Sequence, residues 1–580
     1  MQIEQNLTGY PSIDKPWLKY YDEELISGEI PQVRVYDYMF SKNKDYPNDV
    51  ALNYFGRKIS YASLFENIDK AAKAFKALGV NEGDIVTLCM PSLPETIYSF
   101  YALNRIGAIA NLIDPRYNPE KIKKLINTAK SSVLLFVDAV EAKIEVIADS
   151  ICSTKIICVS PACSFPPMLK VLYLVQNRIS KKHNKSFMTW NAFVQAGANF
   201  DSDYDCRYKP DAPVAIVYTG GTTGTPKGAI MTTIGINTIV YHQKSCMPLV
   251  RRQSRYLDIM PPFIAFGLTC GMNNPLCEGA ELDLIPTFDH HKFDELILKH
   301  RPNHVIGVPS FWEDLSSSKK VKNKDLSFLQ SIIAGGDGMN AASEAKVNDF
   351  LKKHNCFEPL LKGYGLTEVS SCAAFTCTRS SNKIGSVGIP LAKNNIKVVD
   401  PDTNSEVKYN EQGEIYIQTS SIFGGYFNLE TETQENIVID DEGNQWVRTY
   451  DIGYVDEDGC LFIVDRMRNM IIRADGFKVF PQVIENYIMT HSAVETCKVI
   501  GVKDPAFPRG MLPKAFIVIS KDKRDNSATI LNEIQEICNT HLPEYQIPVD
   551  YVIMDELPLT SVGKIDLQAL EKEATRGMSE

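Results

Sequence analysis

The chain has 580 residues, of which 44% are hydrophobic and 23% charged, enough apolar material for more than one core and too little charge for wholesale disorder. Its formal net charge of −10 argues against a nucleic-acid partner, which favours a basic face. The 14 cysteines include no Cys-x-x-Cys pair, which favours reduced, buried thiols over a zinc site. Since the sequence has neither a secretory signal nor an uncharged window of about 18 residues, we expect a cytoplasmic protein.

Apolar runs that are typical of buried strands alternate with segments of helical periodicity. We predict strands at 85–90, 108–113, 133–137 and 155–159, and helices at 94–106, 119–129 and 140–151. The alternation continues with strands at 214–218, 256–260, 282–285, 304–308 and 329–334, and helices at 291–300 and 339–354. This alternation indicates βαβ units and parallel sheets, so we expect an α/β fold with two lobes in the first ~400 residues.

The segment 160–185 breaks this rhythm with two adjacent prolines, followed by an apolar and then a basic stretch. One interpretation is an insertion that touches a membrane surface or guards an apolar substrate mouth. The other is a helix packed on the body of the protein, with a solvated basic end. We favour the packed helix.

Beyond Pro390 the pattern changes to short strands with turn signals, at 413–417 and 459–464, and then to linker-like sequence at 465–470. A compact unit of ~110 residues follows, with helices at 482–491 and 530–541 and strands at 494–502, 515–519 and 550–554. We therefore predict a short-stranded β subdomain and a small C-terminal α+β domain.

The strongest local signal is Thr-Gly-Gly-Thr-Thr-Gly-Thr-Pro-Lys, from Thr219 to Lys227, directly after a predicted strand. Its glycines let the backbone approach an anion, and its hydroxyls and lysine add donors. The alternative is a flexible surface loop. The spacing of Gly224 and Lys227 does not match a P-loop, which disfavours an ordinary P-loop NTPase.

Three further motifs follow in order. Lys-Gly-Tyr-Gly-Leu-Thr-Glu ends at Glu368 and offers a flat tyrosine ring and a carboxylate that suits Mg²⁺ beside a phosphate. Asp451 lies 15 residues before Arg466 of the pair Asp465-Arg466 and can accept hydrogen bonds from ribose hydroxyls. Finally, Lys564 follows a glycine on a predicted turn, from which it can extend into a cleft.

These four motifs, in this order, resemble those of the adenylate-forming superfamily, which includes acyl-CoA synthetases, adenylation domains of peptide synthetases and beetle luciferases. The resemblance runs from Asp49 to Lys564. It implies an N-terminal AMP-binding domain, residues 1–467, and a mobile C-terminal domain, residues 468–580, that rotates about Arg468. That rotation would exchange Lys564 for Gly476, which would line the pantetheine channel.

The resemblance also implies a role for each motif residue. The β- and γ-phosphates of ATP would be wrapped by Thr219, Gly220, Gly221, Thr222, Thr223, Gly224 and Lys227. Tyr364 would stack on adenine, Thr367 would bind the α-phosphate, and Glu368 would hold Mg²⁺. The remaining nucleotide contacts would come from Gly336, Asp337, Asp451 and Arg466, the last two at the ribose. Lys564 would bridge the substrate carboxylate and the α-phosphate.

Departures from the family pattern bear on the substrate. Tyr450 stands where a glycine commonly precedes the ribose aspartate, which puts the local backbone in doubt. Apolar Ile264 and Phe266 offer no carboxylate for an α-ammonium group, and with Gly336 and Gly365 they form the predicted acyl pocket. We therefore expect a medium- or long-chain fatty acid, or a bulky aromatic or steroidal acid.

The leading hypothesis is an acid–thiol ligase that uses ATP, Mg²⁺ and coenzyme A and proceeds through an acyl-adenylate. One alternative is an acyl-AMP ligase that loads the pantetheine of an acyl-carrier protein. Two others are a stand-alone amino-acid adenylation enzyme, disfavoured by Ile264, and an inactive acyl or nucleotide sensor, disfavoured by the retained motif residues.

Overall fold

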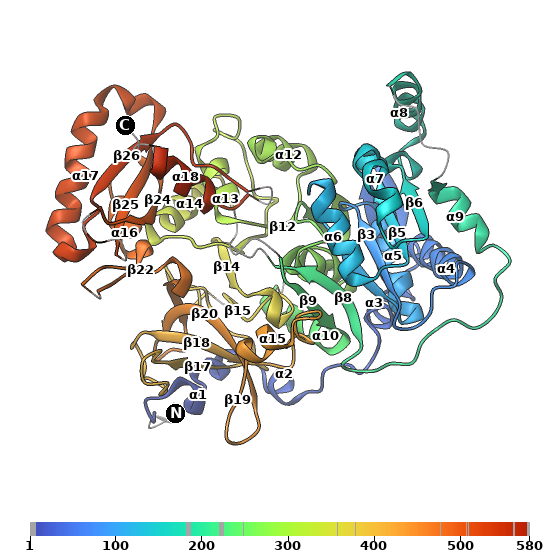
Figure 1. Ribbon diagram of the computed structural model, residues 1–580, viewed down its shortest axis with the longest axis horizontal. Helices are drawn as coiled ribbons and strands as arrows, with labels where there is room; N and C mark the ends of the chain where they lie inside the picture. The colour runs from blue at the N-terminus through green and yellow to red at the C-terminus, as the bar shows by residue number, and fades with distance from the viewer. Residues whose placement is uncertain are drawn as a thin grey trace.

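The computed structural model describes residues 7–180, 187–219, 226–247, 249–356, 358–377, 379–475, 477–505, 507, 510–560 and 563–576. Figure 1 shows two large sheets with helices around them, a smaller β region below, and a C-terminal unit at one end. The architecture is the α/β class predicted from the alternating pattern, with mostly parallel sheets and a small C-terminal domain.

The first large sheet has the order β7-β6-β5-β3-β4-β8-β9. Its strands are β3 (Ile85–Cys89), β4 (Ile109–Leu112), β5 (Val133–Val137), β6 (Lys155–Val159), β7 (Met188–Thr189), β8 (Pro213–Tyr218) and β9 (Gly228–Thr232). All neighbouring pairs are parallel except β8 with β9, which pair antiparallel across the turn that carries the first motif. Helices around it include α4 (Tyr61–Ala77), α5 (Pro94–Ile106), α6 (Pro119–Ala129) and α7 (Glu141–Ile147).

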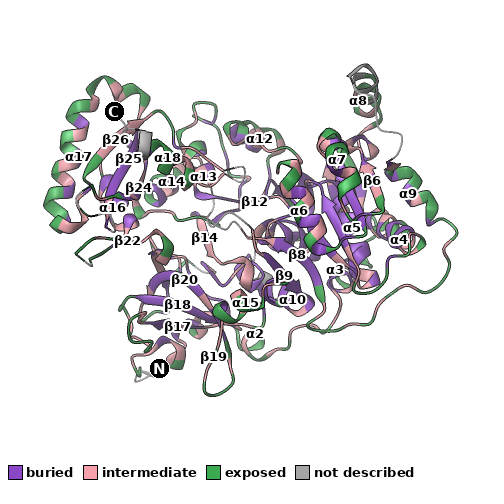
Figure 2. Ribbon diagram, viewed as in Figure 1, coloured by how far each residue is buried: buried purple, intermediate pink, exposed green. Residues whose placement is uncertain are grey.

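The second large sheet has the order β16-β15-β14-β13-β12-β10-β11-β1-β2. Its strands are β1 (Val50–Tyr54), β2 (Arg57–Ser60), β10 (Arg255–Asp258), β11 (Glu281–Leu284), β12 (His304–Gly307), β13 (Ser331–Gly335), β14 (Leu361–Tyr364), β15 (Ala374–Phe375) and β16 (Ile389–Pro390). Helices of this lobe include α10 (Thr233–Cys246), α12 (Phe293–His300), α13 (Pro309–Ser317) and α14 (Ala341–Lys353). One hydrophobic cluster continues through both sheets, so the two predicted lobes share a core (Figure 2).

Two smaller units complete the fold. The β region pairs β17 (Asn395–Val399), β18 (Gly413–Gln418), β19 (Ile437–Ile439), β20 (Gln445–Val455) and β21 (Leu461–Arg466). The C-terminal unit holds β24 (Val494–Lys503), β25 (Met511–Ile519) and β26 (Asp550–Met554), a hairpin of β22 (Ile471–Ile472) and β23 (Lys478–Val479), and helices α16 (Pro481–Ile488), α17 (Ser527–His541) and α18 (Leu567–Arg576). It has hydrophobic clusters of its own.

Local capping explains why several predicted boundaries agree with the structure. Helix α5 begins at Pro94, whose ring favours a first helical turn, and ends before Gly107, which has φ +75°. Helix α6 begins after Asn118, whose side chain accepts a hydrogen bond from the Lys121 backbone. The helix predicted at 140–151 is wrong beyond Ile147: a short 3₁₀ turn follows, and the Ser150 hydroxyl bonds the Ile147 carbonyl at 2.9 Å.

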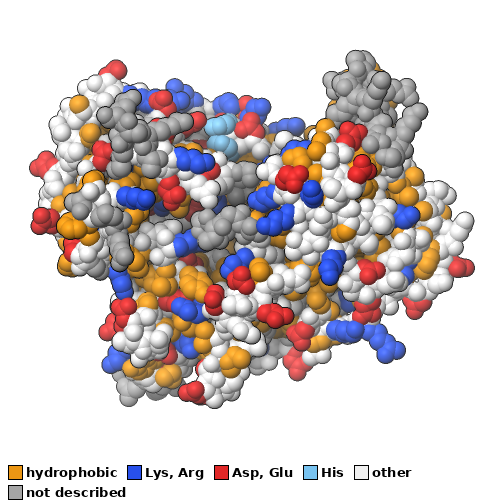
Figure 3. Space-filling view, viewed as in Figure 1, with side chains coloured by type: hydrophobic (Ala, Val, Ile, Leu, Met, Phe, Trp, Pro, Cys, Tyr) orange, Lys and Arg blue, Asp and Glu red, His pale blue; other side chains and the backbone are white. Residues whose placement is uncertain are grey.

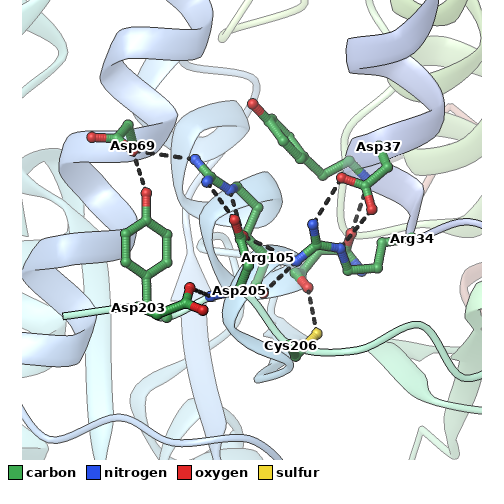
Figure 4. A network of polar contacts seen from close by, with 10 residues as sticks. Arg34, Asp37, Asp69, Arg105, Asp203, Asp205 and Cys206 are labelled. Atoms are coloured by element: carbon green, nitrogen blue, oxygen red, sulfur yellow. Dashed lines mark hydrogen bonds and ion pairs between the residues drawn. The ribbon is translucent and has the colours of Figure 1, made fainter.

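An ion-pair network holds the connection that leads into β8 of the first sheet (Figure 4). Arg105, at the end of α5, donates from Nε and Nη2 to the two carboxylate oxygens of Asp205, at 2.9 Å each. Arg34 also reaches Asp205, at 3.0 Å, and pairs with Asp37. The network ties the N-terminal segment and the strand-to-strand connection to α5, and so holds the approach to the first motif.

The segment 160–185 forms helix α8 (Pro167–Ser180) in its described part. Tyr173 binds Asp138 on the body, but several apolar side chains of α8 are exposed. The packed-helix interpretation therefore holds for one side of the helix only, and residues 181–186 lie outside the described residues. Among the described residues, no helix has both the length and the apolar composition needed to cross a bilayer.

Candidate active site

A cavity of about 1660 Å³ lies where the two large sheets, the β region and the C-terminal unit meet. Its lining includes the described predicted site residues: Thr219, Lys227, Ile264, Phe266, Gly336, Asp337, Tyr364, Gly365, Thr367, Glu368, Asp451, Arg466, Arg468 and Lys564. The predicted contacts Gly220, Gly221, Thr222, Thr223, Gly224 and Gly476 lie outside the described residues. Motifs separated by up to 345 positions, from Thr219 to Lys564, thus line one space.

Asp451 and Arg466 are direct cross-strand partners on β20 and β21. Arg466 Nε lies 3.1 Å from Asp451 Oδ1, and the Tyr364 hydroxyl donates to Asp451 Oδ2 at 2.7 Å. Burial raises the pKa of Asp451, while Arg466 and the Tyr364 hydrogen bond oppose that rise. The result is a buried carboxylate that is oriented by two donors at the edge of the cavity.

The backbone before Asp451 explains the unusual residue at position 450. Tyr450 has φ +57°, in the left-handed region where glycine is favoured and a tyrosine is strained. Its side chain has partners that compensate: its hydroxyl donates to the Glu435 carbonyl at 3.2 Å, and the Arg448 guanidinium lies 4.9 Å from its ring centroid. The sequence departure changes the residue but keeps the left-handed conformation.

Tyr426 connects the first two motifs. Its hydroxyl donates to Glu368 Oε1, and Lys227 Nζ lies 4.9 Å from its ring centroid. The Thr219 amide donates to the Lys227 carbonyl at 2.9 Å, which closes the base of the turn between β8 and β9. We did not predict Tyr426 from the sequence; the Gly-Gly pair before it was the only local signal, and its partners are distant in the chain.

Glu368 follows β14 in a short 3₁₀ turn, Thr367–Val369. Burial raises the pKa of Glu368, and the Tyr426 hydrogen bond opposes that rise. Among the described residues, no group of three or more His, Cys, Asp or Glu side chains could hold a metal ion. Because Mg²⁺ in nucleotide enzymes commonly takes one or two carboxylates and completes its shell with phosphates and water, a single glutamate fits that ion only when a nucleotide is bound.

Lys564 reaches this cavity from the C-terminal unit. The turn that carries it packs on α13: Gly563 has φ +84°, a Cβ there would lie 2.7 Å from the Phe311 ring, and Ser310 Oγ donates to its carbonyl at 3.2 Å. The Lys564 amine lies 3.9 Å from the position of a Cβ on Gly336. Burial lowers the pKa of Lys564, while Asp337 opposes that shift. The sequence predicted a glycine on a turn before Lys564, but not its contact with Phe311, because that contact depends on domain docking.

The other end of the cavity is lined mainly by carbon. Phe266 begins an eight-residue π-helix, Phe266–Asn273, and Ile264 lies two residues before it. Further apolar lining comes from Ile239, Met247, Met260, Phe263, Ile306 and Val308. Gly336 has φ +80°, and a Cβ there would lie 3.8 Å from Phe266. Its backbone conformation is therefore a reason for glycine in addition to the space that the sequence suggested.

The sequence predicts Gly365 as part of the acyl pocket, and the structure gives a steric reason for glycine at this position. A Cβ at Gly365 would lie 1.6 Å from the Ser371 carbonyl oxygen, so glycine is required for the loop to fold back beside its own strand. Gly365 also lines the cavity. Ser370 and Ser371 both have positive φ, at 60° and 128°, which places strained backbone directly after Thr367 and Glu368.

Comparison with known proteins identifies the class that this fold and site define. The family model described as AMP-binding enzyme matches residues 39–427, and that of the AMP-binding enzyme C-terminal domain matches residues 483–564. The chain therefore belongs to the AMP-binding enzyme family of adenylate-forming ligases. It is an acid–thiol ligase of the AMP-forming type, for which ATP and coenzyme A are the expected substrates.

Named relatives are CoA ligases with different acids. The chain is 29% identical over 573 residues to a long-chain-fatty-acid–CoA ligase of Bacillus subtilis (strain 168), covering 97% of this chain and 98% of the relative. It is 29% identical over 518 residues to the 4-coumarate–CoA ligase CCL1 of Humulus lupulus, covering 88% of each. The fold is similar to the crystal structure of an anthranilate CoA ligase, AuaEII, in complex with anthranoyl-AMP, with a TM-score of 0.80, 20% identity, and coverage of 96% and 100%.

Proposed function

We propose that this ligase activates a medium- or long-chain fatty acid, or a bulky aromatic or steroidal acid, and transfers the acyl group to coenzyme A. The observation that carries the proposal is the position of Lys564. Its amine lies beside Gly336, where the charged part of the cavity around Asp451 and Arg466 meets the apolar part around Ile264 and Phe266. A carboxylic acid bound there would place its hydrocarbon part among the apolar side chains and its carboxylate beside the Lys564 amine.

In the first step, one carboxylate oxygen attacks the α-phosphorus of ATP, the bond to the β-phosphate oxygen breaks, and pyrophosphate leaves. Two anions must approach each other, so a preorganised cation lowers the barrier. Lys564 supplies that charge between the carboxylate and the α-phosphate, with Thr367 as a hydroxyl donor. The buried Asp451 accepts hydrogen bonds from the ribose, and Tyr364, whose hydroxyl holds Asp451, presents its ring to adenine.

The triphosphate end belongs to the first motif and to Glu368. Thr219 and Lys227 close the base of the turn that we propose faces the β- and γ-phosphates; the further phosphate contacts proposed at 220–224 lie outside the described residues. Glu368 would hold Mg²⁺, which would neutralise phosphate charge when bound. Tyr426 orients both Lys227 and Glu368, so the two motifs act on the phosphates as one unit.

In the second step, the thiol of coenzyme A attacks the acyl carbon and AMP leaves. We propose that the C-terminal domain, residues 468–580, rotates about Arg468 between the steps, which withdraws Lys564 and brings Gly476 to the pantetheine channel. Arg468 lies in the short turn Met467–Asn469 that follows β21. Asp465, just before this turn, accepts hydrogen bonds from the Asn469 side chain at the end of the turn, at 3.1 Å, and from the Gln482 amide of α16, at 3.0 Å. These bonds connect the end of β21 to the C-terminal unit and make Asp465 a candidate pivot for the domain.

The test is the release of AMP and pyrophosphate with ATP, Mg²⁺ and a panel of acids, each with and without coenzyme A. AMP that accumulates only with coenzyme A, and with fatty or bulky aromatic acids, supports the proposal. Pyrophosphate release without CoA-dependent turnover indicates a carrier-protein acceptor instead. A panel dominated by acetate or by an amino acid contradicts the proposed substrate class.

A further inference from the structure

Helix α8 (Pro167–Ser180) carries an apolar face that nothing in the described chain covers. Among the residues that the structure describes, five of the 17 exposed large hydrophobic side chains belong to it. The exposed fractions are 82% for Met168, 38% for Leu169, 62% for Val171, 55% for Leu172 and 50% for Val175. Figure 1 shows α8 projecting from the body beyond β6 and α7. Single exposed apolar residues are ordinary, but five on one helix mark an interaction surface.

The helix is held in this position from its other side. The Tyr173 hydroxyl donates to both Asp138 carboxylate oxygens, at 2.8 and 3.0 Å. The Phe165 ring lies 5.6 Å from Tyr173, 5.5 Å from Tyr54 and 5.0 Å from Phe55, centroid to centroid. Phe55 is itself exposed and extends the apolar surface onto the β1–β2 hairpin. These contacts fix the helix on the body of the protein and leave its apolar face exposed.

The segment that contains α8 is positively charged, whereas the chain as a whole has a negative net charge. Residues 150–200 contain no aspartate or glutamate, whereas the chain has a net charge of −10. The basic residues in this stretch are Lys155, Lys170, Arg178, Lys181, Lys182 and Lys185. Lys170 and Arg57 both act electrostatically on the buried Glu95 beneath the helix, so positive charge flanks the apolar face within the described structure. Over the face drawn in Figure 3, acidic and basic side chains are intermixed.

We propose that α8 docks this enzyme on an anionic membrane surface, a property beyond its ligase activity. A helix with an apolar face and neighbouring cations inserts that face at the headgroup boundary, and anionic lipids attract the cations. Its 14 residues are fewer than the ~20 that span a bilayer, so the helix lies on the surface. A second copy of the chain is a poorer occupant, because pairing two such segments would place their positive charges together.

The first test is flotation of the full chain with vesicles of phosphatidylcholine alone or with phosphatidylglycerol. The wild type should float with the anionic vesicles, and less so at high salt. The triple variant Met168→Gln, Leu172→Gln, Val175→Gln should lose about tenfold or more in vesicle partitioning. The matched control is Ile13→Gln, Ile439→Gln, Val549→Gln, which changes three exposed apolar residues elsewhere and should float like the wild type.

Equal flotation of the two triple variants would overturn the proposal. The proposal would also be overturned if the wild type did not bind vesicles and light scattering showed the wild type as an oligomer and the α8 triple variant as a monomer. The apolar face would then be covered by a second copy of the chain. A gain-of-signal experiment avoids any concern over folding. Leu172→Trp should be quenched by brominated phospholipids in anionic vesicles, whereas Ile439→Trp should not exceed the wild-type background. Quenching that is the same in both variants contradicts docking through α8.

Discussion

The two ends of the active-site cavity are built from opposite materials. At the end that we propose binds the nucleotide, Asp451, Arg466 and Tyr364 form a connected set of buried or half-buried polar groups. At the end that we propose binds the acyl group, the side chains of Ile264 and Phe266 are apolar. Under this proposal, one cavity binds the nucleotide by directed hydrogen bonds, which demand exact partners, and accepts acids by apolar burial, which tolerates variation. Lys564 stands where the two ends meet.

The largest effect should follow from Lys564→Ala, which removes the cation at the junction. Pyrophosphate release with ATP and acid should fall by about 10²–10³. Thiolysis of a preformed acyl-adenylate should change little, because the proposed rotation withdraws Lys564 before that step. Lys503→Ala, an exposed lysine of the same domain, is the control. Equal loss of both half-reactions would refute the role assigned to Lys564.

Asp451→Asn should weaken the nucleotide end alone. The change leaves Arg466 without its counter-ion and removes a charged acceptor, and hydrogen bonds to charged groups contribute about 1.5–3 kcal/mol, so the KM for ATP should rise about ten- to a hundredfold. The KM for the acid should stay near its wild-type value. Asp458→Asn, which disturbs an exposed pair with Lys19 and Lys383, should leave both constants unchanged. A joint rise in both KM values would show that the two ends are not separate.

Ile264→Trp should give the converse result. Filling the acyl end should lower kcat/KM for long or bulky acids by about tenfold relative to short ones, with the KM for ATP preserved. Ile439→Trp, on an exposed strand away from the cavity, controls for the added ring. A uniform loss across the acid panel would mean that Ile264 does not line the path of the acyl chain.

Substitution of Tyr450 should have the smallest effect, and the quantity that changes should be the free energy of unfolding. The nucleotide end carries a tyrosine at φ +57°, whereas the acyl end carries Gly336 at φ +80°. Both Tyr450→Ala and Tyr450→Gly remove the ring contacts, but only glycine relieves the left-handed strain. The alanine variant should therefore be less stable by about 1 kcal/mol in urea unfolding. Equal stabilities would indicate that the backbone relaxes away from this conformation.

Local rules predicted a large part of this molecule. Alternating patterns located the central strands of both large sheets, β3 to β6 and β8 in the first and β10 to β13 in the second, but not the other strands. Pro94, Gly107 and Asn118 account for helix ends that agree with the prediction. Thr219, Gly336 and Glu368 lie beyond the carboxyl ends of β8, β13 and β14, which each have a parallel neighbour, as expected for ligand sites of such sheets. Asp451 and Arg466 instead face each other on antiparallel strands, and Lys564 comes from the C-terminal unit. What the sequence could not predict depends on contacts between distant segments: Tyr426 on Glu368, and Phe311 beneath Gly563.

The surface was harder to predict than the core. The apolar pattern of 167–175 is equally compatible with packing and with exposure, because periodicity states which residues share a face and not whether that face finds a partner. The bond from Tyr173 to Asp138 turns the exposed side outward.

The most direct test of the central claim follows one oxygen atom. With a carboxylic acid labelled with ¹⁸O in its carboxyl group, ATP, Mg²⁺ and coenzyme A, the bridging oxygen of an acyl-adenylate stays with the phosphate when the thiol attacks carbon. Mass spectrometry should therefore find one labelled oxygen in AMP and one in the thioester. Unlabelled AMP, or label in ADP or inorganic phosphate, would contradict the acyl-adenylate route and the role of Lys564 at the junction.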